Sequence, residues 1–263
     1  MSQPKRDARR SASRRSNWRG VLTLMTALAL LAALLYAGLR VSHDPRFNVV
    51  VGPISGLGHT GRGDVLQALA LRPDQNAWLL NRRASAARVE RLPWVKTAHV
   101  SIRWPNVLHV ALSERQPVAS VVLAAGNGEE PLPRYALIDP SQRVLTLARV
   151  REPQAGLPLL LITPAPNAAV QPGDALDNKS VGQALEALSR LKALGLQVSE
   201  VAIAPATGIS ARADRDLRVL FGDDEDLAKK AAVFQAIVAK ISQPAHIAYI
   251  DVRSVRAPTV LYR

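Results

Sequence analysis

The feature that most constrains this chain is an uninterrupted apolar stretch near its N-terminus, from Val21 to Leu39. The stretch contains no charged residue and no proline, and a helix formed by it would be apolar on every face. A helix rises 1.5 Å per residue, so about 19 residues cover roughly 28 Å, close to the thickness of a bilayer's hydrocarbon core. We therefore predict a transmembrane helix over residues 21–39.

The charges on either side of this stretch predict its orientation. The first twenty residues carry seven basic residues and one acidic residue, and such segments stay in the cytoplasm. Residues 1–20 are thus predicted to be a basic cytoplasmic tail without regular structure, which retains the helix and contacts anionic lipid rather than nucleic acid. Everything after Arg40 is then exported. The alternative is a cleaved signal peptide, but its apolar core is usually shorter and ends in a small-x-small site, which residues 35–40 lack.

Several patterns that carry chemistry in other proteins are incomplete here. The chain has no cysteine, which excludes disulfides, thiol catalysis and cysteine-based metal sites. None of its five histidines belongs to a close ligand pair, and the acids at 223–226 lack the spacing of a calcium loop. Residues 56–61 match G-x-G-x-x-G but lack the long helix and the later acidic residue of a dinucleotide site, so a turn is favoured. We expect no catalytic, metal or cofactor residue, and hence no enzyme.

Residues 46–116 are predicted to form a first exported domain with the order β-α-α-β-β. Its expected elements are a strand at 47–54, helices at 64–71 and 83–92, and strands at 95–104 and 107–114. Pro53 should place the first strand at a sheet edge or in a bulge, because proline cannot donate to a ladder. The last two strands alternate apolar and polar residues, which predicts a hairpin with one buried face. Trp94 and Trp104 are expected to lie in that buried core.

Residues 117–263 are predicted to form a second, strand-rich α+β domain. Its expected strands are 118–123, 135–138, 144–147, 198–204, 208–213, 217–221, 246–252 and 259–262. Two amphipathic helices are expected at 180–194, capped by Ser180, and at 224–241. The last strand should lie at a sheet edge, because nothing follows it along the chain.

Residues 92–119, LPWVKTAHVSIRWPNVLHVALSERQPVA, resemble the hairpin of the FtsQ/DivIB family of bacterial division proteins. Leu137-Ile138-Asp139, residues 185–195 and the segment IAYIDVR at 247–253 resemble the second domain of that family. Two positions depart from the family pattern: Gln142 stands where the family usually has glycine, and Pro53 interrupts the first strand.

The resemblance implies a POTRA domain followed by an FtsQ-type β domain. It further implies a non-enzymatic scaffold at the division septum, which spans the inner membrane once and links early cytoplasmic to late periplasmic division proteins. Its implied partners are coiled-coil proteins of the FtsB and FtsL type and other divisome membrane proteins. Matching IDVR to the family implies that Arg253, Ser254 and Arg256 contact FtsB, and the terminal strand adds Thr259 and Val260 to this predicted site.

Two other classes of function stay open at this point. One is another POTRA-bearing envelope assembly or secretion factor, although such proteins usually end in a transmembrane barrel, for which this chain has too few strands. The other is a membrane-tethered enzyme that acts on wall polymers, which would need an acid–base pair in a cleft.

Overall fold

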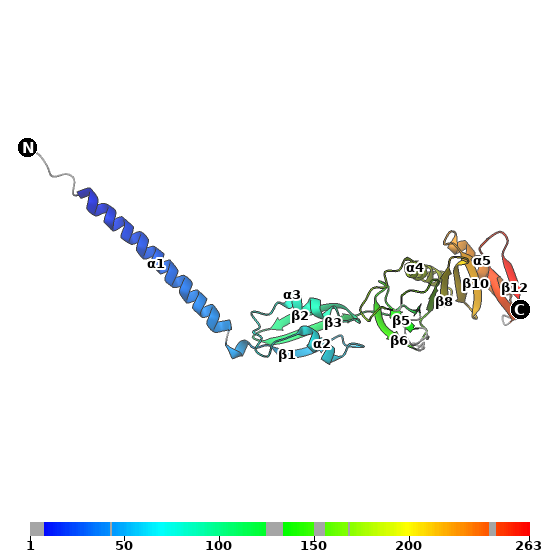
Figure 1. Ribbon diagram of the computed structural model, residues 1–263, viewed down its shortest axis with the longest axis horizontal. Helices are drawn as coiled ribbons and strands as arrows, with labels where there is room; N and C mark the ends of the chain where they lie inside the picture. The colour runs from blue at the N-terminus through cyan, green and yellow to red at the C-terminus, as the bar shows by residue number, and fades with distance from the viewer. Residues whose placement is uncertain (1–7, 43, 125–133, 150–155, 168, 242–245) are drawn as a thin grey trace, which may run out of the picture.

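The computed structural model describes residues 8–42, 44–124, 134–149, 156–167, 169–241 and 246–263. A long helix, a small sheet with two helices and a large sheet with two further helices follow one another in a row (Figure 1). The predicted α+β class with an N-terminal apolar helix is confirmed. Residues 126–133, between the predicted strands 118–123 and 135–138, lie outside the described residues.

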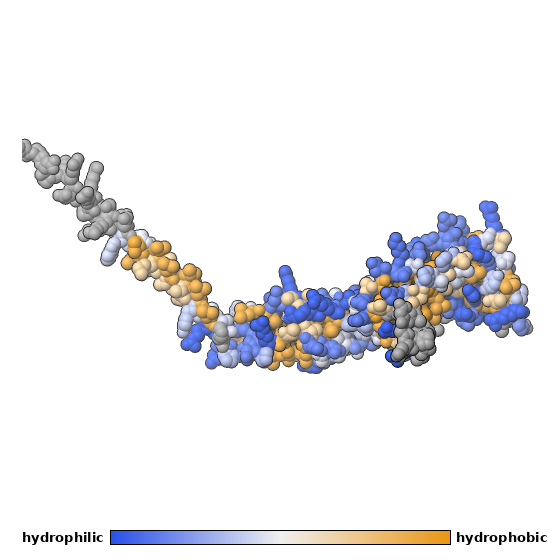
Figure 2. Space-filling model, in the orientation of Figure 1, coloured by the Kyte–Doolittle hydropathy of each residue, from blue (hydrophilic) through white to orange (hydrophobic). Residues whose placement is uncertain are grey.

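The first helix, α1, spans Ala8–Ser42. Its segment Gly20–Ser42 has a mean hydropathy of 2.1, and none of it is buried against the rest of the chain. Figure 2 shows this segment as a continuous apolar band, in contrast to the mixed surfaces of the two domains. The helix is thus long and apolar enough to cross a membrane. The expectation of a tail without regular structure is wrong from Ala8 onward, since alanine and arginine are good helix formers and continue the helix toward the N-terminus.

The first domain combines a three-stranded sheet with two short helices. Its elements are the 3-10 turn η1 (Pro45–Phe47), β1 (Val50–Ser55), α2 (Arg62–Leu69), α3 (Arg82–Val89), β2 (Val95–Arg103) and β3 (Val107–Glu114). The strand order is β1-β3-β2, with β1 parallel and β2 antiparallel to β3. β1 therefore lies at an edge, and its register shifts between Val51 and Ile54, so the structure confirms both consequences expected of Pro53. The helices pack on the sheet around a core of Val65, Leu69, Val89, Val95, Val100, Leu108 and Val110.

The tryptophan prediction for this domain is wrong. Trp104 is 54% exposed, because β2 ends at Arg103 and the alternation of the strand no longer orients the next side chain. Trp94 precedes β2 and is half-buried, with its ring stacked on the imidazole of His59 at a centroid distance of 4.0 Å.

The glycine-rich loop at residues 56–61 binds a carboxylate of its own chain. The backbone N–H groups of Gly58, His59 and Thr60 donate to the Glu114 carboxylate at 2.8–3.0 Å. Burial raises the pKa of Glu114, but these hydrogen bonds more than offset it and hold the pKa at about 2. The N–H groups that a dinucleotide site would direct at phosphate are therefore occupied by Glu114, which agrees with the predicted turn.

The second domain is built on a nine-stranded sheet. Its strands are β4 (Ala119–Leu123), β5 (Arg134–Ile138), β6 (Val144–Ala148), β7 (Leu159–Ile162), β8 (Val198–Ala204), β9 (Gly208–Ala213), β10 (Leu217–Gly222), β11 (Ile247–Asp251) and β12 (Thr259–Tyr262). Their order is β12-β11-β10-β9-β8-β7-β4-β5-β6. The helices α4 (Lys179–Ala193) and α5 (Leu227–Lys240) lie side by side on one face, as Figure 1 shows, and bury Leu188, Leu191, Phe234 and Val238 against it.

Three local predictions for this domain are corrected. Residues 159–162 are absent from the predicted strands, yet they form β7, which lies between β4 and β8 in the interior of the sheet. Asn178, not Ser180, caps α4, since its side chain accepts from the N–H groups of Ser180 and Val181. α5 begins at Leu227 rather than Asp224, because Asp226 has a left-handed backbone conformation that a helix cannot include.

A buried ion pair joins the two domains. The Arg115 guanidinium, which follows β3, donates to the Asp139 carboxylate at 2.7 Å, and only 16% and 5% of these side chains are exposed. Arg143 adds a second link by donating to the carbonyl oxygen of Arg91 at 3.1 Å. Burial raises the pKa of Asp139, but the Ser141 hydroxyl and the Arg115 guanidinium more than offset it and hold the pKa below its usual range. The second sheet is thereby held in a defined position on the first domain.

Candidate partner-binding edge

The candidate site is the last strand, β12, together with its connection to β11. β12 stands at the end of the nine-stranded sheet, and within the described residues it pairs with β11 alone. Figure 1 places it beside the C-terminus, at the opposite end of the molecule from α1. The predicted edge position of the terminal strand is confirmed. An edge strand presents a row of N–H and C=O groups that can pair with another chain.

One hydrogen bond beside β11, together with the alternation of N–H directions along a strand, shows which N–H groups of β12 face outward. Arg263 donates its N–H to the carbonyl oxygen of His246, on the β11 side. Because N–H groups alternate in direction along a strand, the N–H groups of Thr259 and Leu261 also point toward β11. Those of Val260 and Tyr262 therefore point away from the sheet, where an added strand would lie.

The connection between the two strands is held by an ion pair at its start. The Arg253 guanidinium donates to both carboxylate oxygens of Asp251, at 2.6–3.1 Å, and the Arg253 N–H also donates to this carboxylate at 3.0 Å. These hydrogen bonds hold the pKa of Asp251 below its usual range, against a smaller opposing effect of burial. The stem of Arg253 lies over Gly222, where an added Cβ would stand 3.0 Å from its Cγ. Arg253 is therefore a fixed cation, with 52% of its side chain exposed.

The five predicted site residues lie within one short segment, but their surroundings differ. Ser254, Arg256 and Thr259 are exposed, whereas Val260 is half-buried and packs against the domain core. No ion pair among the described residues involves Arg256, in contrast to Arg253. The site thus combines one fixed arginine, one exposed arginine and an open strand edge.

Sequence reasoning missed two residues of this edge. Leu261 and Tyr262 of the edge strand are 49% and 64% exposed. The available signal was the apolar run 259–262 at the end of the chain. Both residues directly follow Thr259 and Val260 in the predicted edge strand, but the predicted site ended at Val260.

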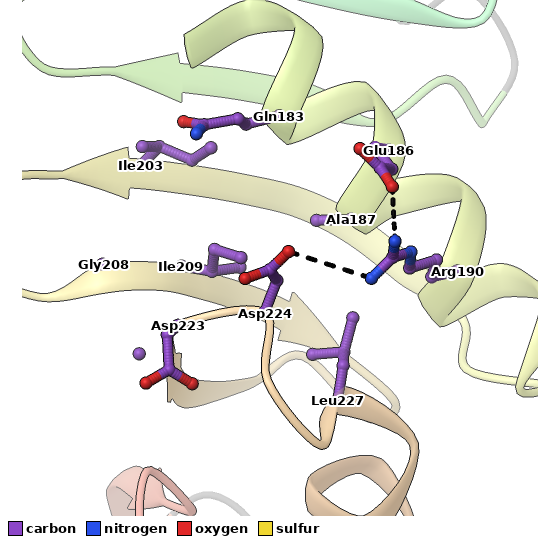
Figure 3. A pocket seen from close by; sticks show the side chains of 11 residues that line it. Gln183, Glu186, Ala187, Arg190, Ile203, Gly208, Ile209, Asp223, Asp224 and Leu227 are labelled. Atoms are coloured by element: carbon purple, nitrogen blue, oxygen red, sulfur yellow. Dashed lines mark hydrogen bonds and ion pairs between the residues drawn. The ribbon is translucent and has the colours of Figure 1, made fainter.

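The second domain also has a hollow between α4, the start of α5 and the ends of β8, β9 and β10. It has a volume of about 250 Å³, and Gly222 contributes to its lining. Figure 3 shows Arg190 reaching from α4 toward Glu186 and toward Asp224 on the opposite wall, 3.9 Å away. Arg190 thus pairs with two of the three carboxylates that line the hollow, and the third, Asp223, pairs with Lys230 of α5. The described residues contain no group of three His, Cys, Asp or Glu side chains that could hold a metal ion.

Comparison with known proteins agrees with this architecture. The family model for the FtsQ-type POTRA domain matches residues 53–115, and the model for the C-terminal part of cell division protein FtsQ/DivIB matches residues 131–253. The chain combines an apolar anchor-type helix, a POTRA domain and a strand-rich domain, and it belongs to the FtsQ/DivIB family of cell division proteins.

Individual relatives carry the same name. The chain is 28% identical to the cell division protein FtsQ of Mycobacteroides abscessus over 94% of this chain and 72% of that protein. It is 28% identical to the FtsQ of Anaeromyxobacter over 75% of this chain and 65% of that protein. A shorter match to the FtsQ of Myxococcus fulvus is 36% identical, but it spans only 30% of this chain and 28% of that relative.

Proposed function

We propose that this protein is a non-enzymatic scaffold of the division machinery, which α1 anchors in the inner membrane at the septum. The basic tail stays in the cytoplasm, and both domains lie in the periplasm. The POTRA domain then binds other divisome membrane proteins, and the edge strand β12 binds the partners of the FtsB and FtsL type. The outward edge of β12 is the single observation that carries this proposal, because it offers a binding surface on a domain of this family.

The proposed binding mode is strand addition. An extended segment of the partner would lie beside β12 and pair with the outward N–H groups of Val260 and Tyr262. The exposed Arg256 and the fixed Arg253 favour an acidic partner segment. This is consistent with the positions of all five predicted site residues, since Ser254 and Thr259 lie between and beside these groups.

The two other classes of function have less support. The match of the FtsQ/DivIB C-terminal model to residues 131–253 favours a division protein over an assembly or secretion factor. For a wall enzyme, the hollow beside α4 would need an acid and a base free to exchange protons. Arg190 is instead paired with Glu186 and Asp224, and Asp223 is paired with Lys230.

The test uses the full chain in lipid nanodiscs and a purified FtsB/FtsL pair from the same cells. We expect saturable binding in calorimetry, and a fluorescent fusion of the chain should form a band at mid-cell. No binding together with diffuse envelope fluorescence would contradict the proposal. Truncation after Val252 is a poor variant, because Val260 packs on the core and Arg263 pairs with His246. The substitutions in the Discussion test the edge without removing the strand.

A further inference from the structure

The end of the POTRA domain nearest α1 carries a cluster of exposed apolar side chains. Trp78, Leu79 and Trp104 are 59%, 65% and 54% exposed. The two indole rings lie against each other with a centroid distance of 4.4 Å, and the ring of Phe47 meets Trp78 edge-on at 6.2 Å. None of the four belongs to the buried core of the domain. We refer to Trp78, Leu79 and Trp104 as the tryptophan surface.

Hydrogen bonds hold this surface at the C-terminal end of α1. The Asn76 side chain donates to the carbonyl oxygens of Val41 and Ser42, at 3.0 and 3.2 Å, and so caps the last turn of the helix. The Ala77 N–H donates to the carbonyl oxygen of Phe47 at 2.8 Å, which fixes the backbone just before Trp78.

The second tryptophan is held at the same end by the β2–β3 turn. The Asn106 side chain donates to the carbonyl oxygen of Asn48 at 3.0 Å, and the Val50 N–H donates to the carbonyl oxygen of Asn106 at 3.0 Å. Both tryptophans are therefore attached to the few residues that directly follow the apolar helix.

The chemistry of this end of the domain suits a bilayer interface. Tryptophan is enriched where an apolar body meets hydrated headgroups, because its ring is apolar and its N–H needs a polar partner. Exposed arginines lie in or beside these segments: Arg46 in η1, Arg72 between α2 and α3, and Arg103 at the end of β2. They can contact anionic headgroups. On α1 itself Tyr36 lies six residues before the end of the helix at Ser42, and its hydroxyl accepts from Arg40 at 3.2 Å.

We propose that the tryptophan surface is a membrane foot, which inserts into the headgroup region of the leaflet that α1 enters on the exported side. The inference rests on the proposed anchoring of α1 and goes beyond it, because a single helix leaves the attached domain free to tilt and rotate. Two contacts with the bilayer, the helix and the foot, fix the tilt of the POTRA domain. The distal edge at β12 is then presented at a set height above the membrane.

The chain's lack of cysteine makes a site-specific test simple. Single cysteines are introduced as Leu79→Cys in the foot, Leu57→Cys at the far end of β1 and Leu30→Cys within the apolar segment of α1. Leu57 is a matched control, since it is an exposed leucine of the same domain at 38%. Each full-length variant is spin-labelled and reconstituted into vesicles of phosphatidylethanolamine and phosphatidylglycerol, without any other protein. Accessibility to oxygen, which enters lipid, is compared with accessibility to a water-soluble nickel chelate.

We expect a severalfold higher oxygen-to-chelate ratio at position 79 than at position 57, and the highest ratio at position 30. Adding Trp78→Ser and Trp104→Ser to the Leu79→Cys variant should lower the ratio at position 79 toward that at position 57. Equal ratios at 79 and 57, with position 30 in lipid, would overturn the foot and leave the anchoring intact. A lipid-like value at 79 that disappears when protein is diluted into more lipid would also overturn it, because a second copy would then cover the surface. A water-like value at position 30 would overturn the anchoring itself, and the foot with it.

Discussion

The nine-stranded sheet has two edge strands, β6 and β12, and they differ in whether another segment of the chain lies beside them. At β6 the segment that contains Gly173 and Asp174 covers the first residue of the edge strand: the Gly173 N–H donates to the carbonyl oxygen of Val144 at 2.7 Å, and the Val144 N–H donates to that of Asp174 at 2.8 Å. At β12 the N–H groups of Val260 and Tyr262 point away from the sheet. The chain itself covers the start of the β6 edge, and we infer that the β12 edge binds a partner. We refer to β6 as the closed edge and to β12 as the open edge.

Each edge also has its own Asp–Arg pair, and the two pairs differ in burial. Asp139 and Arg115 lie beside the closed edge, with 5% and 16% of their side chains exposed. Asp251 and Arg253 lie beside the open edge, with 16% and 52% exposed. A buried pair is costly to break, whereas an exposed pair contributes little to stability. Substitutions at the closed edge should therefore change folding, and those at the open edge should change binding.

The largest effect is expected for Val260→Pro. Proline removes an outward N–H that the sheet itself does not use, and it keeps an apolar side chain against the core. We expect at least a hundredfold loss of affinity for the FtsB/FtsL pair, roughly 3 kcal/mol or more, with an unchanged midpoint of unfolding. The matched control is Val260→Ala, which keeps the N–H and should bind. Parent-like binding by the proline variant would show that no strand is added here.

Asp139→Asn is the counterpart at the closed edge. Removing this carboxylate leaves the buried Arg115 charge without its partner, so the free energy of unfolding should fall by about 3 kcal/mol at neutral pH. Since the pKa of Asp139 is lowered, its contribution is complete above the usual pKa of an aspartate and is lost as the pH falls through the lowered value. Denaturant unfolding at neutral and acidic pH measures both. An effect on partner affinity without an effect on stability would reverse the roles of the two edges.

Arg256→Glu should have a smaller effect, confined to binding. The side chain is exposed, so reversing its charge should slow association with an acidic segment about tenfold at low salt and much less at high salt. Stopped-flow or surface-based kinetics at two salt concentrations separates the association rate from the dissociation rate. Arg218→Glu, an exposed arginine on β10, serves as the control. A change that persists at high salt would point to a direct, desolvated contact.

The smallest effect is expected for Asp251→Asn. It releases the Arg253 guanidinium from its fixed position, but this pair is partly exposed, so the loss in thermal stability should be slight. The lowered pKa of Asp251 means that this slight contribution is present above the usual aspartate pKa and disappears in acid. Partner affinity should fall modestly, because the Arg253 guanidinium would no longer be held in one orientation. A thermal melt together with a binding isotherm checks both expectations.

Much of this architecture could be predicted because strand alternation and helical periodicity are local. The apolar helix, the first domain with its edge strand at Pro53, and the terminal edge strand all followed from such patterns. The amphipathic helix predicted at 224–241 corresponds to α5, which buries Ala231, Phe234 and Val238.

The errors arose where the outcome depends on what lies across space. Trp104 leaves the core because β2 ends one residue earlier, and the apolar run at 159–162 becomes a central strand only because β4 and β8 flank it. Gln142, which stands where the family usually has glycine, has a positive φ of 62°. Its side-chain oxygen accepts from the Asn178 N–H at 3.3 Å, a contact that no local pattern indicates. No local pattern in the sequence indicated that another segment of the chain would lie beside β6.

The most direct test of the open edge is amide hydrogen exchange at single residues of β12, measured on the full chain with and without the FtsB/FtsL pair. The amides of Thr259 and Leu261 already donate to β11 and should change little on binding. Those of Val260 and Tyr262 should exchange quickly in the free protein and become strongly protected in the complex, because an added strand would accept their N–H groups. Saturated binding that leaves Val260 and Tyr262 as fast as in the free protein would contradict the account.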